Sequence, residues 1–514
     1  MEEKPKRKAI FSLSDQENAL TYARELIGLG WKIIATSETR DLLKENNVPV
    51  EDISDFFKIK DKYPFPPTLH PFLELILTTE HVDAVDLVYV TTYPLSKGND
   101  IGGHAILALA AKGRRIVISD KKDMGDVIQI LKMNNNEISQ PLRRQLIDKV
   151  YAKAAKHYLS LIQSSETAEN TQIIIGAHAA SLSEGENPYQ VPSDLFRVDD
   201  DDALALSNFR QASGDLPCYT NMADLDCLLQ TLCLVTSAFI KRYEKVPNIA
   251  IAAKHGNSCG LAIDWSSPEI AVENALSANP IAIFGGEVIV NFSINKKLAE
   301  LLVSSSKRES SLGDPNWSLD LIVAQNFEQE AIEILKNRKR LKLFKNENLT
   351  RPYLGRSKWS YRMVRGGFLR QPPGNYILDF GGSGFEFSLP DSNCLDSLII
   401  AWATAWTSFH GGNEVAIAKD RMLLSAAGGP ATIDACHIAI DRAKRCGRDL
   451  QNSVFAADAF FPFRDAPEEL IKAGCAYGIA PKGGKNFEEI KGCFKKHSVG
   501  VYYLPEQFRG FCRH

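Results

Sequence analysis

The chain has 514 residues, of which 44% are hydrophobic and 24% charged, and its formal net charge is −3. This length exceeds one hydrophobic core, so we expect two or more domains, and the charge gives no reason to expect nucleic acid or an anionic membrane as a partner. All ten cysteines lie at or beyond Cys218 and none forms a C-x-x-C pair. That spacing argues against a disulfide framework and a structural zinc site, so no metal is expected. The sequence has no signal-peptide core and no apolar run of about 18 residues, which predicts a soluble, cytoplasmic protein.

The N-terminal part alternates predicted strands and helices. Ala9–Leu13 has the apolar run of a buried strand, Ser14 opens a capping box for the next helix, and Trp31–Ala35 predicts a second strand. A further helix is expected from about Thr39, and Asp86–Thr91 predicts a later strand. This alternation is typical of a parallel α/β sheet, whose ligands bind beyond the carboxyl ends of the strands.

Two later stretches are polar. Residues 133–171 are expected to form a helical connector between a domain at 1–132 and a larger one at 172–514. The basic run Lys336–Lys345 is interpreted as a solvated helix end, because no aromatic platform accompanies it as nucleic-acid binding would require.

The most informative stretch is Ile249–Ile263. An apolar, alanine-rich run stops at Lys254 and His255, and a glycine-bearing turn follows before the apolar pattern resumes. A strand that carries two nitrogen bases to its end is a candidate proton-transfer site, although a solvated lysine beside a packed histidine would look the same. A similar run, VAIAKD at Val415–Asp420, indicates a faint internal repeat.

Several blocks of the N-terminal part resemble a known family. They are SLSDQENALTYARELIGLGWKIIATSETRDLL, PTLHP, YPL, DIGG and LALAAKGR. They resemble the N-terminal half of the bifunctional purine-biosynthesis family AICAR transformylase/IMP cyclohydrolase, a methylglyoxal-synthase-like domain that closes the purine ring of IMP. The resemblance implies cyclohydrolase roles for Tyr93, Asp100 and Lys112.

From about Gln172 onward the resemblance continues, now to the transformylase half of the same family. The matching blocks are GENPYQ, CYTNMADLD, KHGNSCG, FGG, LDLIVAQNFEQEA, VRGGFLRQ, AKDRM, DAFFPFRD and the terminal FRGFCRH. This half is expected to hold two cytidine-deaminase-like α/β subdomains without zinc. The resemblance also implies a homodimer whose transformylase sites form across the interface.

The family moves a formyl group from its co-substrate 10-formyltetrahydrofolate to the exocyclic amine of an aminoimidazole carboxamide ribonucleotide, AICAR. Such an amine must lose a proton as it attacks, and the oxyanion that forms must be stabilised. The resemblance implies Lys254 and His255 as the proton-transfer pair and Asn413 as the oxyanion donor. It also implies substrate or folate contacts for Asn221, Phe284, Gly285, Asp320, Phe460, Asp465 and Arg509.

The chain departs from the family where phosphate is held. Ser37-Glu38 replace a glycine pair in the phosphate loop, and Pro67 replaces a lysine. Ser183-Glu184 replace an Arg-Tyr pair, and Ala426–Thr432 lacks the family's glutamine, serine and arginine. Loss of a cation removes a charged partner of the phosphate, and loss of glycine prevents the backbone N–H groups from approaching it closely. Both changes weaken phosphate binding.

These departures lead to three hypotheses. The first is a formyltransferase that acts on AICAR or a related carboxamide, with an altered or inactive cyclohydrolase-like domain. The second is the full bifunctional enzyme, and the third is a non-catalytic scaffold or regulatory homologue. Lys482 and Lys485 are candidates for relocated phosphate ligands.

Overall fold

The computed structural model describes residues 7–58, 66–164, 172–198, 201–355, 357–380 and 390–512. It divides into two compact units, Met1–Ile175 and Gly176–His514, and each is considered by itself. The domain boundaries expected at residues 132 and 171 remain a prediction.

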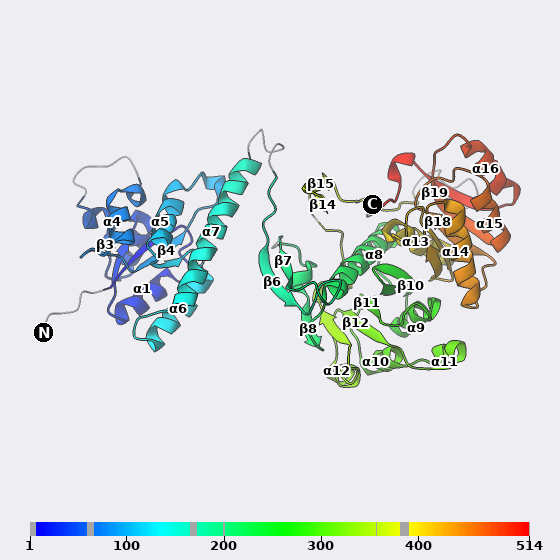
Figure 1. Ribbon diagram of the computed structural model, residues 1–514, viewed down its shortest axis with the longest axis horizontal. Coiled ribbons are helices and arrows are strands. Elements are labelled where there is room, and N and C mark those ends of the chain that lie inside the picture. The colour runs from blue at the N-terminus through cyan, green and yellow to red at the C-terminus, as the bar shows by residue number, and fades with distance from the viewer. Residues whose placement is uncertain are drawn as a thin grey trace. The chain divides into compact units, whose positions relative to one another are not determined.

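Unit 1 contains a parallel five-stranded sheet in the order β3-β2-β1-β4-β5 (Figure 1). Apolar side chains cover both faces of this sheet, as expected where helices pack on each side. The elements are β1 (Lys8–Leu13), α1 (Ala19–Gly28), β2 (Lys32–Ala35), α2 (Ser37–Glu45), β3 (Glu51–Asp52), α3 (Ile53–Phe56), α4 (Phe72–Thr78), β4 (Leu87–Thr91), α5 (Ile101–Lys112), β5 (Ile116–Ile118), α6 (Lys121–Met133) and α7 (Gln140–Gln163).

The first helix does not begin as the capping box predicts. It starts at Ala19, after Asn18 in the left-handed conformation and without a side-chain cap. Ser14 instead donates its backbone N–H to the carbonyl of Thr91 at the end of β4. The capping-box prediction at Ser14 is therefore wrong, because a tertiary contact competes with the local helix signal.

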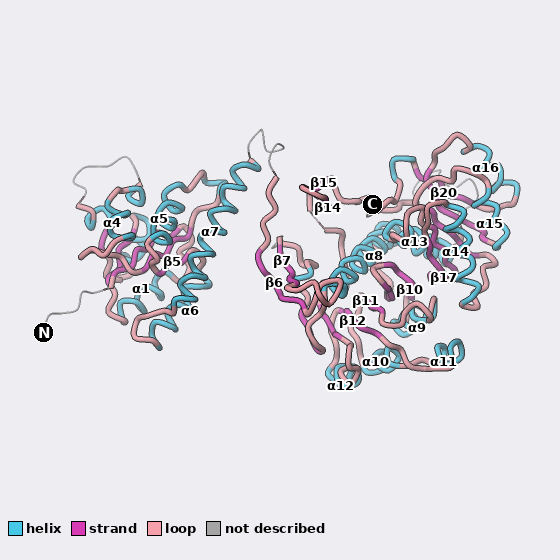
Figure 2. The backbone as a smooth tube through the Cα atoms, viewed as in Figure 1, coloured by secondary structure: helices cyan, strands magenta, loops and turns pink. Residues whose placement is uncertain are grey.

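The long helix α7 lies within unit 1. It contacts β5 and α5 (Figure 2), and Lys153 on it donates a hydrogen bond to the carbonyl of Ser119 over 2.6 Å. The polar stretch expected to connect two domains therefore contributes a helix that packs against the parallel sheet.

Unit 2 contains an eleven-stranded sheet in the order β20-β19-β18-β16-β17-β10-β9-β11-β12-β13-β8. Its two halves run outward from the β17–β10 contact in matching order, each as an antiparallel hairpin, an antiparallel third strand and two parallel strands. One half has a further antiparallel edge strand, β8, beyond β13. The strands of this sheet are β8 (Arg210–Ser213), β9 (Asn248–Lys254), β10 (Asn257–Asp264), β11 (Gly286–Val290), β12 (Leu319–Ala324), β13 (Lys342–Lys345), β16 (Val415–Lys419), β17 (Met422–Ala427), β18 (Ser453–Ala457), β19 (Cys475–Pro481) and β20 (Gly500–Leu504). Two separate two-stranded sheets pair β6 (Ala177–Leu182) with β7 (Ser193–Arg197), and β14 (Ser360–Val364) with β15 (Gly367–Gln371).

Helices cover both faces of this sheet. Two long helices pack together on one face, and the helices between later strands of each half lie on the other. They are α8 (Tyr219–Tyr243) and α13 (Ser392–Thr407) on the first face, and α9 (Pro268–Ala278), α10 (Lys296–Val303), α11 (Ser306–Leu312), α12 (Gln329–Leu335), α14 (Thr432–Arg445), α15 (Asp465–Ala473) and α16 (Phe487–Lys496) in the later crossovers.

The helix α8 is the one element in the described residues that is long and apolar enough to cross a membrane. Within unit 2, however, 72% of its most apolar window is buried. It packs against α13 and the sheet, so its apolar character is accounted for by the core.

Candidate functional site

The turn that follows β9 presents Lys254 and His255. His255 and Gly256 have φ of 52° and 69°, the paired left-handed conformation of a type I′ hairpin turn. A side chain at Gly256 would place its Cβ 2.7 Å from Sγ of Cys227 and 2.9 Å from Cζ of Phe409. Glycine is therefore required there, and the β9–β10 hairpin fixes the backbone of the two residues.

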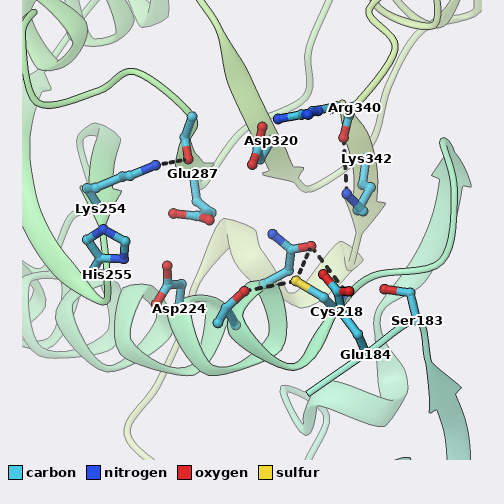
Figure 3. Close-up of a pocket in the computed structure, with 13 residues that line it drawn as sticks. Ser183, Glu184, Cys218, Asp224, Lys254, His255, Glu287, Asp320, Arg340 and Lys342 are labelled. Atoms are coloured by element: carbon cyan, nitrogen blue, oxygen red, sulfur yellow. Dashed lines mark hydrogen bonds between the residues drawn. The ribbon is translucent and has the colours of Figure 1, made fainter. Parts of the chain in front are cut away.

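A cavity of about 510 Å³ opens beside this turn. Figure 3 shows Lys254 and His255 at one end of it, three acidic side chains across its middle, and Arg340 and Lys342 at the other end. Its volume is in the range of small-molecule sites. The lining residues are Ser183, Glu184, Cys218, Thr220, Asn221, Asp224, Lys254, His255, Gly285, Glu287, Asp320, Arg340 and Lys342.

Lys254 is held by the backbone of the neighbouring strand. Its Nζ donates a hydrogen bond to the carbonyl of Gly285, which has a φ of +66° and precedes β11. A Cβ at Gly285 would lie 2.9 Å from that Nζ and 3.9 Å from Oδ2 of Asp320. The glycine thus leaves room for the ammonium group at the cavity wall.

Acidic side chains form the middle of the cavity. Asp224 comes from α8, Glu287 from β11 and Asp320 from β12. Burial, followed by the charge of Asp224, raises the pKa of Glu287 to about 9, while Lys254 opposes this rise. The protonated form of Glu287 is therefore favoured, and its carboxyl group shares a hydrogen bond with that of Asp224. Sequence reasoning named neither Asp224, although it lies in the matching block CYTNMADLD, nor Glu287, which opens an apolar run after the FGG block.

The far end of the cavity carries both signs of charge. Arg340 and Lys342 come from the basic run Lys336–Lys345, which leads from α12 into β13. Lys342 begins β13 rather than ending a helix, whereas Arg340 is exposed, as the interpretation of this run as a solvated helix end expects. Glu184 lines the same cavity, and its carbonyl accepts a hydrogen bond from the backbone N–H of Tyr219 over 2.9 Å.

Asn221 lies in the first turn of α8 and takes part in capping the start of this helix. It is buried, and its Oδ1 accepts a hydrogen bond from the backbone N–H of Cys218 over 3.2 Å in a capping arrangement. Cys218 and Thr220 line the cavity with it. The first turn of a long helix therefore faces the cavity, which favours negative charge there.

Other residues expected at the site lie elsewhere in unit 2. Phe284 is 69% exposed and is not part of the cavity lining. Asn413 donates from Nδ2 to the carbonyls of Gly429 and Pro430, over 3.0 and 3.1 Å. The loop after β17 thus uses both donors of this amide.

Three further residues lie next to elements of the other half of unit 2: Phe460 follows β18, Asp465 begins α15 and Arg509 follows β20. The guanidinium of Arg509 lies 5.1 Å from the ring centroid of Phe460 and pairs with Glu506. Asp465 is exposed at the start of α15, where its carboxylate accepts the N–H of Ala466 over 2.8 Å. None of these three lines the cavity beside Lys254.

In unit 1 the structure brings Tyr93 and Asp100 together. Asp100 caps α5 by accepting the N–H of Gly103 over 2.7 Å, and its other oxygen accepts the N–H of Tyr93 over 3.2 Å. Lys112 lies at the opposite end of α5 and pairs with Glu74 over 2.7 Å.

The segment after β2 leads directly into a helix. Ser37 and Glu38 are the first residues of α2, after Thr36 at the cap. A carboxylate in the first turn stabilises the positive end of the helix, which is where a phosphate would otherwise bind. Pro67 begins a short 3₁₀ turn, Pro67–Leu69, and has no backbone N–H to donate.

Two family models match this chain. A family model described as the AICARFT/IMPCHase bienzyme matches residues 110–442, well over half of the chain. The chain belongs to this family. A second family model, described as an MGS-like domain, matches residues 18–114. The fold expectation of an MGS-like parallel-sheet domain followed by an AICARFT/IMPCHase region is confirmed, as is membership of a family of enzymes.

Several known proteins match this chain over nearly its whole length. Proteins named bifunctional purine biosynthesis protein PurH from Polynucleobacter necessarius and Persephonella marina are each 27% identical to it, covering 97% of this chain and 98% of theirs. The protein of that name from Caldicellulosiruptor saccharolyticus is 28% identical with the same coverage. A solved structure titled Crystal structure of ForH matches at 24% identity and a TM-score of 0.28, covering 30% of this chain and 97% of that one.

Proposed function

We propose that the chain transfers a formyl group from 10-formyltetrahydrofolate to the exocyclic amine of AICAR or of a related aminoimidazole carboxamide. The observation that carries this proposal is the Lys254–His255 pair at one end of a cavity of about 510 Å³, in a chain that belongs to the AICARFT/IMPCHase family. Two nitrogen bases fixed by a tight turn beside a small-molecule cavity suit proton transfer.

The two bases take complementary roles in this proposal. The amine nitrogen attacks the formyl carbon, His255 removes the proton that the amine loses, and Lys254 gives a proton to the folate nitrogen as its bond to carbon breaks. The exposure of His255 lets its imidazole reach a bound amine. The carbonyl of Gly285 holds the ammonium of Lys254 at the wall.

Asn413 as oxyanion donor requires a change of partners. An amide has two N–H donors, and those of Asn413 both serve the loop carbonyls of Gly429 and Pro430. We assign it this role only in a homodimer, where a second copy would bring its loop to the cavity. Exposed apolar side chains on the β14–β15 hairpin, such as Met363 and Leu369, favour such an assembly.

The cations at the far end of the cavity support an anionic acceptor. Arg340 and Lys342 stand opposite the bases, where the phosphate of a nucleotide would lie if its ring reached His255. They suit this task better than Lys482 and Lys485, which follow β19 and do not line this cavity.

Ring closure in unit 1 is expected to be weak or absent. Glu38 occupies the first turn of α2, and Lys112 is paired with Glu74 rather than with the Tyr93–Asp100 cluster. Conversion of the formylated carboxamide ribonucleotide to IMP by the purified chain would instead support the full bifunctional enzyme.

The test is release of tetrahydrofolate from 10-formyltetrahydrofolate and AICAR by the full chain. Lys254→Met and His255→Gln are each expected to lower kcat by roughly 10²- to 10⁴-fold, the usual contribution of positioned acid–base groups. Lys419→Met is the matched control, since Lys419 ends the equivalent strand β16 but pairs with Asp449 over 2.7 Å. No product with AICAR or its riboside, together with no thermal shift from a folate analogue, would establish the non-catalytic alternative.

A further inference from the structure

Asn257 opens β10 directly after the turn that carries His255. Its Nδ2 donates a hydrogen bond to the carbonyl of His255 over 3.2 Å, and its Oδ1 accepts the backbone N–H of Phe409 over 2.8 Å. Phe409 lies 152 residues further along the chain, in the loop of residues 408–414 between α13 and β16. One amide therefore joins the turn of a proposed proton-transfer residue to a loop from the other half of unit 2.

The ring of Phe409 meets the same turn. A Cβ at Gly256 would lie 2.9 Å from Cζ and 3.2 Å from Cε1 of Phe409, so the ring packs directly against this glycine. Phe409 thus contacts the turn twice, through its ring at Gly256 and through its backbone N–H at Asn257. A close-packed ring resists displacement and a hydrogen bond is directional, so together they fix the turn relative to the loop.

A buried carboxyl group anchors the loop in turn. Glu414 is 2% exposed, and its Oε1 accepts the backbone N–H of His410 over 2.5 Å. Its Oε2 contacts Nδ1 of the same histidine over 2.6 Å, and a Cβ at Gly428 would overlap this carboxyl group. Two hydrogen bonds from one residue to one buried group leave that residue little freedom. The residue that follows Phe409 is therefore held in place, and the loop can serve as a fixed anchor for the turn.

Formation of the turn does not by itself require this asparagine. The equivalent hairpin in the other half of the sheet, β16–β17, has two left-handed turn residues with φ of 51° and 64°. Met422 follows them and pairs with Lys419, as Asn257 pairs with Lys254 in the first hairpin. A methionine side chain has no N–H donor and only a weak acceptor, and the hairpin forms with it. A role in closing the hairpin therefore does not explain the amide of Asn257.

We propose that Asn257 is a positioning residue for formyl transfer: it ties the His255 turn to the loop at Phe409 and so holds the imidazole where it can remove a proton from the amine. This inference rests on the proposed formyl transfer and adds to it a residue outside the cavity lining. His255 is exposed, so the place of its ring depends on the backbone of the turn. A displacement of about 1 Å can cost roughly 10²-fold in rate, so the tie acts on kcat rather than on binding.

The experiment measures tetrahydrofolate release by the full chain in Asn257→Ala and Asn257→Met. Both variants remove the amide, and methionine is the residue that the other hairpin accepts at this place. We expect kcat to fall at least about tenfold, while KM for AICAR and for 10-formyltetrahydrofolate stays within about threefold. In a His255→Gln background, Asn257→Ala should cause no further fall in kcat, because the asparagine acts through that histidine.

Asn248→Ala is the matched control. Asn248 lies at the open end of the same hairpin, where its Nδ2 donates to the carbonyl of Asp264 over 3.1 Å. This variant should lower Tm and leave kcat unchanged. An unchanged kcat in both Asn257 variants, an equal loss of kcat in Asn248→Ala, or an additional loss in the His255→Gln background overturns the inference while leaving formyl transfer intact.

Hydrogen exchange separates the tie from the function on which the inference rests. Asn257→Ala should accelerate exchange in residues 408–414, where the N–H of Phe409 loses its acceptor, and Asn248→Ala should not. Unchanged exchange in that segment overturns the tie whether or not the chain is active. No release of tetrahydrofolate by the wild type overturns formyl transfer, and accelerated exchange would then support the tie alone.

Discussion

Lys254 and Gly285 meet across neighbouring strands: the lysine amine at the end of β9 donates to the carbonyl just before β11. This contact fixes the direction of the ammonium group, and the lack of a side chain at Gly285 leaves space for it. The position of a proposed proton donor therefore depends on a backbone feature 31 residues away in sequence.

Gly285→Ala should disable formyl transfer without unfolding the chain. Its Cβ would lie 2.9 Å from Nζ of Lys254, so the ammonium group must move. The φ of +66° adds a conformational cost of about 1–2 kcal/mol for a non-glycine residue. We expect kcat to fall at least about tenfold, as measured by tetrahydrofolate release, since small displacements of reacting groups are costly.

Gly313→Ala is the matched control for Gly285→Ala. Gly313 ends α11 with a φ of +72°, and a Cβ added there would meet no other atom within 4 Å. It should show a similar loss of stability in denaturant unfolding with unchanged kcat. Equal kcat losses in the two variants would mean that backbone strain, and not the lysine, limits the reaction.

The hairpin that carries the bases could be predicted from the sequence, and so could its faint repeat. Lys254 and Lys419 each end the first strand of a hairpin. The turns that follow have φ of 52° and 69° in one half, and 51° and 64° at Asp420 and Arg421 in the other. Local patterns specify such turns, because hydrophobic runs and turn residues act over a few positions.

The rest of the cavity could not be predicted in this way. Glu287, Arg340 and Lys342 reach it because β11, β12 and β13 lie successively beside β9, an order that no local pattern specifies. Asn413 was expected at the site by resemblance, yet its amide donates to carbonyls of the loop after β17. Residue identity predicts the available chemistry, whereas long-range strand order determines which groups share a cavity.

Glu184→Gln should tighten binding of a phosphorylated acceptor. Glu184 lines the cavity together with Arg340 and Lys342, so its negative charge opposes a phosphate there. We expect roughly a three- to tenfold fall in KM for AICAR at low salt, and no change for its unphosphorylated riboside. Glu186→Gln, which alters a carboxylate in the lining of a different cavity, should change neither value. An equal gain for nucleotide and riboside would show that Glu184 does not face the phosphate.

Asp458→Asn should reduce the loss of stability as pH rises from about 4 to 7. Burial, together with the charge of Glu414, raises the pKa of Asp458 to about 7 from a usual value of 3.8. The folded state therefore keeps a proton that the unfolded chain releases, and wild-type stability falls with rising pH across that window. Urea unfolding at pH 4.5 and 7.5 should show a smaller decrease for the variant. Parallel pH profiles for the two proteins would contradict this assignment.

His104 should make the packing of α7 sensitive to acid. Its ring stacks on that of His157 with centroids 4.0 Å apart, joining α5 to α7. Burial, and then the charges of His157 and Lys153, lower the pKa of His104, while Asp100 opposes them. The folded state therefore favours the neutral ring, so this contribution to stability is present above about pH 6.5 and is lost on further acidification. Hydrogen exchange in α7 of the full chain should accelerate as the pH falls from 7.5 to 5.5, after correction for intrinsic rates. The variant His104→Phe should reduce that acceleration, because it keeps a stacked ring without a titrating group. His437→Phe, at an exposed position of α14, is the control, and an acceleration that persists unchanged in His104→Phe would assign the acid sensitivity to another group.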